Sequence, residues 1–251
     1  MSSKITIFFF SLLFLEIYSL RDTNTFSNYE QIKQTNIDAN FDIDFEQSVI
    51  HGTVKIYFQA LADGEVIVLD TRALKIKSVI DSDTGDELDY VLDSQYELDA
   101  NGIPLKVYKE YSKDDQLAIV IKYDTTSEGS AVQFLTPEQT TGKKYPYMFT
   151  QCESILCREL LPVQDTPAVK ITVNVGLTVV KPLFALYSGI YQNKIDNGDT
   201  ITYFYSQKVP IPSYLIAIAA GDIEERVISD RTKVYGEREI VDKAAYEFED
   251  T

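Results

Sequence analysis

The polar residues between Thr136 and Pro167 are the strongest candidates for chemistry in this sequence. The stretch contains both cysteines and a cluster of polar side chains that strand periodicity does not explain, namely Thr150, Gln151, Glu153, Arg158, Gln164 and Asp165. Irregular segments carried by a rigid sheet are where binding sites usually lie. A carboxylate in such a segment, as at Glu153, can accept the charged amino group of a peptide N-terminus. We therefore predict a substrate-binding edge rather than a complete active site.

Glu153 also has a purely structural interpretation. Arg158 or a lysine would pair with it as ordinary scaffolding, and the residues alone favour this role over substrate contact. Arg158 and Asp165 are expected to form a buried ion pair that holds the loop together.

The two cysteines, Cys152 and Cys157, are five residues apart. In a secreted chain one disulfide is the usual expectation. A disulfide that closes so short a loop would stabilise the fold only modestly, and it would need favourable geometry. Two buried free thiols are the alternative, and the spacing leaves both open. A metal site is not expected, because the chain has no further soft ligands.

The histidine count limits the hydrolytic chemistry available to this chain. His51 is the only histidine. A zinc site of the His-Glu-x-x-His type needs two imidazoles one helical turn apart, so this sequence cannot build one. A serine or cysteine triad would have to recruit His51 through the fold, and we expect a surface or strand-edge histidine instead.

Composition sets further bounds. The chain has 251 residues, 45% of them hydrophobic and 25% charged, which is typical of a globular protein. Its formal net charge of −16 excludes nucleic acid as an expected partner, because there is no basic stripe to displace phosphate counterions.

The N-terminus has the layout of a secretory signal peptide over residues 1–19. Lys4 precedes an apolar run, Ile5 to Leu15, which is too short to span a bilayer. We therefore predict a secreted protein or one in the lumen of the secretory pathway. An uncleaved membrane anchor is the alternative, because Glu16 and the bulky residues after it make a poor cleavage site. Residues 20–36 are polar without a period and predict a loose leader.

From Ile37 the chain reads as an all-β domain. Apolar and polar residues alternate from Ile37 to Phe45 and again from Val54 to Phe58, which predicts a hairpin. Further strands are predicted at Val66–Leu69, Leu74–Ile80, Leu117–Tyr123 (covered on both faces), Ile171–Val180, Ile201–Tyr205 and Tyr214–Ala220. So many short strands with almost no helix predict a sandwich-like architecture.

One amphipathic helix is predicted at the end of the chain. Val241, Ala244, Ala245 and Phe248 fall at helical spacing, and no later sequence is present for this stripe to contact. We interpret residues 236–251 as the first helix of a following domain that is absent from this chain.

Three stretches carry a specific resemblance to a known family. They are FLTPEQTTGKKYPYMFTQCESILCRELLPVQDTPAVKITV, KVPIPSYLIAIAAGDIEER and TKVYGEREIVDKAAYEFEDT. The sequence from about Ile37 to Thr251 resembles the N-terminal domain of the leukotriene-hydrolase branch of the zinc aminopeptidases. The resemblance implies a curved, saddle-shaped, multi-sheet β domain over residues 37–235. It also implies a thermolysin-like catalytic domain as a partner.

The resemblance changes the interpretation of Gln151, Glu153 and Ser154. In the family the matching segment lines the pocket for the first residue of the substrate, and a glutamate matching Glu153 holds the free α-amine. The leukotriene-hydrolase branch tends to have Gln and Ala where this chain has Glu153 and Ser154. The resemblance therefore implies that this chain binds peptide N-termini rather than a lipid epoxide. It also implies that Cys152 and Cys157 need not pair.

The family's zinc-binding helix, catalytic tyrosine and C-terminal helical domain have no counterpart in this sequence. The family uses zinc, but we expect no cofactor in this chain and no turnover by it alone. Our first hypothesis is a non-catalytic domain that lines a peptide-binding cleft. Alternatives are a fragment of a complete secreted zinc aminopeptidase, or a secreted β-sandwich that binds carbohydrate or protein through Tyr-rich loops, for which an exposed aromatic platform would be the distinguishing feature.

Overall fold

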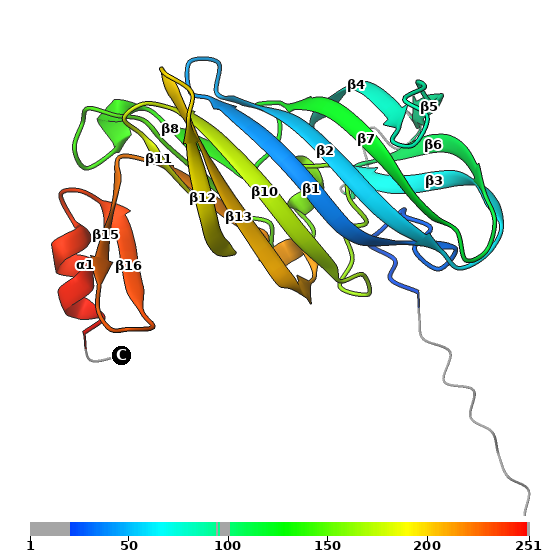
Figure 1. Ribbon diagram of the computed structural model, residues 1–251. Helices are drawn as coiled ribbons and strands as arrows, with labels where there is room; N and C mark the ends of the chain where they lie inside the picture. The colour runs from blue at the N-terminus through cyan, green and yellow to red at the C-terminus, as the bar shows by residue number, and fades with distance from the viewer. Residues whose placement is uncertain (1–20, 94, 96–100, 250–251) are drawn as a thin grey trace, which may run out of the picture.

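The computed structural model describes residues 21–93, 95 and 101–249 (Figure 1). The predicted signal peptide, residues 1–19, lies outside the described residues. The strands, in chain order, are β1 (Ile32–Asp44), β2 (Val49–Ala60), β3 (Gly64–Thr71), β4 (Leu74–Asp81), β5 (Tyr90–Leu92), β6 (Ile103–Tyr111), β7 (Gln116–Thr125), β8 (Val132–Leu135), β9 (Tyr147–Thr150), β10 (Ile171–Val180), β11 (Phe184–Tyr187), β12 (Ile190–Asp196), β13 (Thr200–Ile211), β14 (Ile218–Gly221), β15 (Ile223–Val227) and β16 (Lys233–Glu237). Short 3₁₀ turns occur at η2 (Pro137–Gln139), η3 (Cys157–Glu159) and η4 (Ser213–Leu215), and α1 (Val241–Glu247) is the α-helix of the described part.

The strands form several sheets around one core, which confirms the predicted all-β, multi-sheet class. A seven-stranded sheet with the order β12-β13-β10-β1-β2-β7-β4 runs along the molecule (Figure 1). A three-stranded sheet (β3-β6-β5) lies toward one end and a four-stranded sheet (β11-β14-β9-β8) toward the other. The segment between β9 and β10, residues 151–170, connects the small sheets to the large one.

The β1–β2 hairpin shows why these residues form a sheet with two different faces. Their register pairs Ile37 with Ile56 and Ala39 with Val54, all of them buried. The side chains between them point to the other face, which is half-buried or exposed, because successive side chains in a strand alternate. β1 also pairs in parallel with β10, so the centre of the sheet joins two distant parts of the chain.

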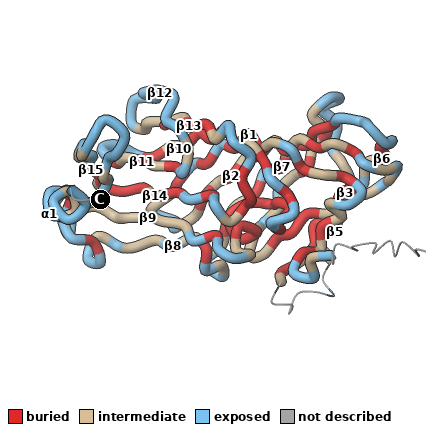
Figure 2. The backbone as a smooth tube through the Cα atoms, turned by 90° about the horizontal axis from the view of Figure 1, so that it is seen from below, coloured by how far each residue is buried: buried red, intermediate tan, exposed pale blue. Residues whose placement is uncertain are grey.

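The C-terminal helix contacts the β15–β16 hairpin. Val241 is fully buried beside Gly236, and the Arg226 Nε atom donates to the Asp242 carboxylate across 2.5 Å. Much of α1 is exposed, as its pale blue tube shows (Figure 2). Tyr246 on this helix is 78% exposed, and Phe248 just after it is 51% exposed. None of the helices in the described residues has the length and apolar character that crossing a membrane requires.

Three sequence predictions need correction. The leader of residues 20–36 is not loose throughout, because β1 begins at Ile32 and Thr25 and Ser27 are buried. Residues Tyr214–Ala220 do not form one strand, since η4 occupies Ser213–Leu215 before β14 begins. β7 is not covered on both faces, because Lys122 is exposed. The hairpin and the strand at Ile171–Val180 are confirmed.

Candidate functional site

The segment that follows β9 divides into an exposed part and a buried part. It leaves the four-stranded sheet at Thr150, whose hydroxyl oxygen accepts the Ile218 N–H across 2.9 Å. The next backbone N–H, of Gln151, donates to the Ala131 carbonyl across 2.8 Å. The chain then turns, with the Leu156 N–H donating to the Cys152 carbonyl, and enters η3.

The three predicted substrate-binding residues lie together on the exposed part. The side chains of Gln151, Glu153 and Ser154 are all exposed. The Gln151 side-chain oxygen accepts the Glu153 backbone N–H across 3.3 Å, and the peptide bond between Glu153 and Ser154 is cis. The structural interpretation of Glu153 does not hold here, because no lysine or arginine of the described residues lies within ion-pair distance of its carboxylate.

The buried part is organised by Arg158, whose side chain is 1% exposed. Its Nε atom donates to the Asp165 carboxylate across 3.0 Å, which confirms the predicted ion pair. The two terminal nitrogens donate to the carbonyls of Asn24 and Asn101. The guanidinium therefore connects three parts of the chain that are distant in sequence.

Asp70 is a second carboxylate in this cluster, and no local sequence pattern marks it. It accepts the Thr25 hydroxyl across 2.5 Å and the Phe26 and Asp165 backbone N–H groups, and it lies 3.9 Å from Arg158. The pKa of Asp70 is raised above its ordinary value, because burial disfavours the charged carboxylate. The charge of Arg158 and these hydrogen-bond donors offset part of that effect. Together with Arg158, which donates to the Asn24 carbonyl, Asp70 thus holds the leader against the core.

Glu159 connects the buried part to the base of the exposed part. Its carboxylate accepts the backbone N–H groups of Ser130 and Ala131, across 2.5 and 2.7 Å, and it pairs with Arg72. The carbonyl of Ala131 in turn accepts the Gln151 N–H. Glu159 therefore positions the loop on which the backbone of Gln151 rests. Sequence reasoning missed it because its partners lie 28 and 29 residues earlier.

Both cysteines are free and buried, which settles the open choice between a disulfide and two thiols. Burial, together with contact with the Cys152 thiol, raises the pKa of the Cys157 thiol well above its ordinary value. A thiol held protonated in this way is a poor nucleophile. These side chains therefore contribute to the core beneath the exposed part, where Tyr123 donates to the Leu160 carbonyl.

The donor set of the described residues does not fit a zinc ion. His51 lies on the sheet surface, with its Nδ1 atom 2.6 Å from the Asp124 carboxylate. In residues 21–93, 95 and 101–249 no three His, Cys, Asp or Glu side chains are grouped so as to hold a metal.

The fold is similar to part of the solved structures of a leukotriene A4 hydrolase and of an M1 zinc metallopeptidase. The native hydrolase of Saccharomyces cerevisiae is 34% identical, with a TM-score of 0.81, and the match covers 93% of this chain and 36% of that one. The M1 zinc metallopeptidase of Deinococcus radiodurans, at 18% identity and a TM-score of 0.65, shares the fold over 82% of this chain and 46% of its own.

Residues 26–215 match the peptidase M1 N-terminal domain, and the chain belongs to this family. It is 41% identical over 221 residues to leucine aminopeptidase 2 of Aspergillus fumigatus, covering 85% of this chain and 35% of that protein. It is 32% identical over 238 residues to leukotriene A-4 hydrolase of Xenopus laevis, covering 92% of this chain and 38% of the hydrolase. The chain thus spans little more than a third of the length of these relatives.

Proposed function

We propose that this chain supplies the part of a peptidase cleft that binds the N-terminus of a peptide. The observation that carries the proposal is the contrast around η3. The Glu153 carboxylate is exposed to solvent and has no ionic partner among the described residues, while Arg158 fixes the same segment in the core. A carboxylate on a fixed backbone is suited to a charged α-amine, because the geometry of the hydrogen bond is set before the ligand arrives.

In this proposal Glu153 accepts the ammonium group, and Gln151 and Ser154 line the space around it. The hydrogen bond from the Glu153 N–H to the Gln151 side chain couples the two residues. Hydrolysis and zinc belong to a catalytic domain that this chain would contact. The relatives named above support such an arrangement, since one is a leucine aminopeptidase and another a zinc metallopeptidase.

The second candidate is that this chain is one portion of a complete zinc aminopeptidase. It is favoured by the matched length, 35% of leucine aminopeptidase 2. Reading the transcript beyond the codon for Thr251 separates the two candidates. A downstream His-Glu-x-x-His sequence would support the complete enzyme, and an immediate stop codon would support a separate domain.

A chimera tests the role of Glu153. Residues 21–249 replace the matching portion of leucine aminopeptidase 2 of Aspergillus fumigatus, and hydrolysis of a leucine anilide is followed. Glu153→Ala should lower kcat/KM by about 10- to 100-fold, because a hydrogen bond to a charged group contributes roughly 1.5–3 kcal/mol.

The matched control is Glu128→Ala, which removes another exposed carboxylate from a nearby loop. It should leave kcat/KM within about twofold of the parent chimera. Equal kcat/KM values for the Glu153 and Glu128 variants would rule out the proposed contact. Independently, the purified chain alone should release no amino acid from the anilide.

We also propose that the chain enters the secretory pathway, on the basis of the apolar run Ile5 to Leu15 after Lys4. Expression of the full sequence in a eukaryotic cell, followed by N-terminal sequencing of the product, tests this. A mature chain in the medium that begins near residue 20 is expected. An intact N-terminus on protein retained in the cytosol would contradict it.

A further inference from the structure

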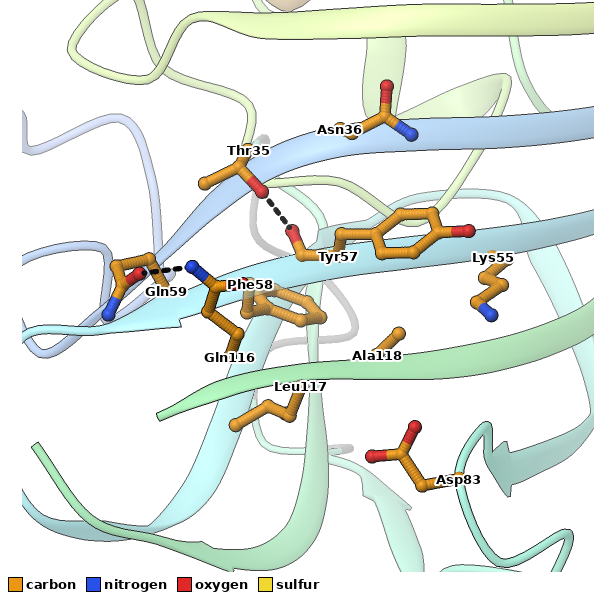
Figure 3. A pocket seen from close by; sticks show the side chains of 10 residues that line it. All are labelled: Thr35, Asn36, Lys55, Tyr57, Phe58, Gln59, Asp83, Gln116, Leu117 and Ala118. Carbon is orange, nitrogen blue, oxygen red and sulfur yellow. Dashed lines mark hydrogen bonds between the residues drawn. The ribbon is translucent and has the colours of Figure 1, made fainter. Parts of the chain in front are cut away.

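A hollow on the outer face of the seven-stranded sheet is a second candidate binding site. It has a volume of about 520 Å³ and lies over β2 and β7 (Figure 3). Its lining includes Lys55, Tyr57, Asp83, Gln116, Leu117 and Ala118. The segment that carries Glu153 contacts the other face of this sheet, where the Tyr123 hydroxyl donates to the Leu160 carbonyl. The hollow is therefore separate from the site proposed above.

The hollow exists because a small residue faces a large one across two strands. Ala118 on β7 pairs directly with Tyr57 on β2, so the tyrosine ring borders a space that the alanine methyl group does not fill (Figure 3). The loop after β4 forms another wall. It is tied to the sheet because the Ser82 N–H donates to the Ala118 carbonyl across 3.1 Å. The Asp83 N–H donates to the Asp81 side chain across 2.9 Å. Both walls are thus part of the folded framework.

Two opposite charges face this space. Figure 3 shows Lys55 and Asp83 on either side of Ala118, toward the same end of the hollow. Among the residues that the structure describes, neither has an ion-pair partner within 4.0 Å, whereas Asp81, the last residue of β4, pairs with Lys109. The Lys55 ammonium lies 4.9 Å from the centre of the Tyr57 ring. The side chain between the two charges is apolar, because Ala118 lies there (Figure 3). Phe58 and Leu117, 2% and 8% exposed, point into the core on the other face of the sheet.

We propose that this hollow binds a small zwitterion with an apolar side chain, namely a free α-amino acid or a dipeptide. Lys55 pairs with the ligand carboxylate, Asp83 pairs with its ammonium group, and the apolar side chain rests on Ala118 and against the Tyr57 ring. The Tyr57 hydroxyl is occupied by its 2.7 Å hydrogen bond to Asp38, so the ring contributes its face and edge rather than its polar end. The volume falls within the usual range for small-molecule sites, about 300–1,000 Å³.

The test pairs ligand changes with side-chain changes in the full 251-residue chain. Binding of leucine, leucinamide and N-acetylleucine is measured by saturation-transfer NMR at low salt. Leucinamide lacks the carboxylate and N-acetylleucine lacks the ammonium group, so each should bind about fivefold more weakly than leucine, as expected for the loss of one exposed ion pair. Lys55→Met should bind leucine and leucinamide equally. Asp83→Asn should bind leucine and N-acetylleucine equally.

Matched controls are Lys122→Met on the same face of β7 and Asp86→Asn on the same loop, neither of which lines the hollow. Both variants should still bind leucine about fivefold more tightly than leucinamide or N-acetylleucine. Failure of the unmodified chain to bind leucine, or unchanged discrimination in the Lys55 and Asp83 variants, would overturn the proposal. Binding of the neutral sugar cellobiose at the same place, insensitive to both charge removals, would also overturn it and would indicate a carbohydrate site instead.

Discussion

The two parts of the segment after β9 have similar polarity in the sequence and opposite roles in the fold. Residues 151–155 expose Gln151, Glu153 and Ser154, whereas residues 157–165 bury Arg158, Glu159 and Asp165 almost completely. The carboxylate of Glu153 has no ionic partner in the described structure, while that of Asp165 accepts from Arg158 and from the Ser213 hydroxyl.

The difference shows how a binding loop can be both polar and fixed. Apart from the Arg158–Asp165 ion pair, the strong interactions of the buried part run to elements elsewhere in the chain: the leader, β3 and the residue after it, the loops before β6 and β8, β7, and η4. The exposed part makes few such interactions, which leaves its side chains available for a ligand. Variants in the two parts should therefore separate stability from binding.

The largest loss of stability is expected for Arg158→Met. Removal of the guanidinium leaves Asp70 and Asp165 buried with fewer partners and frees the carbonyls of Asn24 and Asn101. Breaking one partner of a buried ion pair costs about 3–5 kcal/mol of unfolding free energy. Urea denaturation measures the free energy of unfolding, and Arg231→Met, which removes an exposed guanidinium, is the control. A loss below about 1 kcal/mol would mean that the cluster does not hold the segment in place.

Glu159→Gln should have an intermediate effect. The amide keeps the shape of the side chain but loses the charge that accepts the Ser130 and Ala131 N–H groups and pairs with Arg72. We expect a loss of about 1–3 kcal/mol in the same measurement. Amide exchange of Gln151 should also become faster, because its acceptor is the Ala131 carbonyl. Unchanged exchange at Gln151 would show that the two parts are not coupled through this loop.

The smallest effect on stability is expected for Glu153→Ala. Its side chain is exposed and has no ionic partner among the described residues, so the free energy of unfolding should change by less than about 0.5 kcal/mol. The same denaturation experiment gives this value beside the Arg158 result. A loss as large as that of Glu159→Gln would assign Glu153 a structural role and remove the contrast between the two parts.

The sequence was sufficient for the fold class and for local interactions, and insufficient for long-range ones. Period-two alternation predicted the β1–β2 hairpin, and the seven-residue separation of Arg158 and Asp165 was short enough to suggest their ion pair. Asp70 lies 95 residues before Asp165, Thr25 lies 45 residues before Asp70, and nothing in their local pattern marks them as members of the same cluster. The leader was predicted to be loose for the same reason, because polar residues that satisfy distant backbone groups have no periodicity.

The parallel pairing of β1 with β10 has a consequence for how the chain is synthesised. Asn36 lies beside Thr172, so the middle of the large sheet cannot close until more than a hundred intervening residues have left the ribosome. Until then β1 has an open edge, with unsatisfied amide and carbonyl groups that can recruit another nascent chain. We therefore expect folding to be slow and limited by the pairing of β1 with β10. We also expect the nascent chain to depend on chaperones during translation.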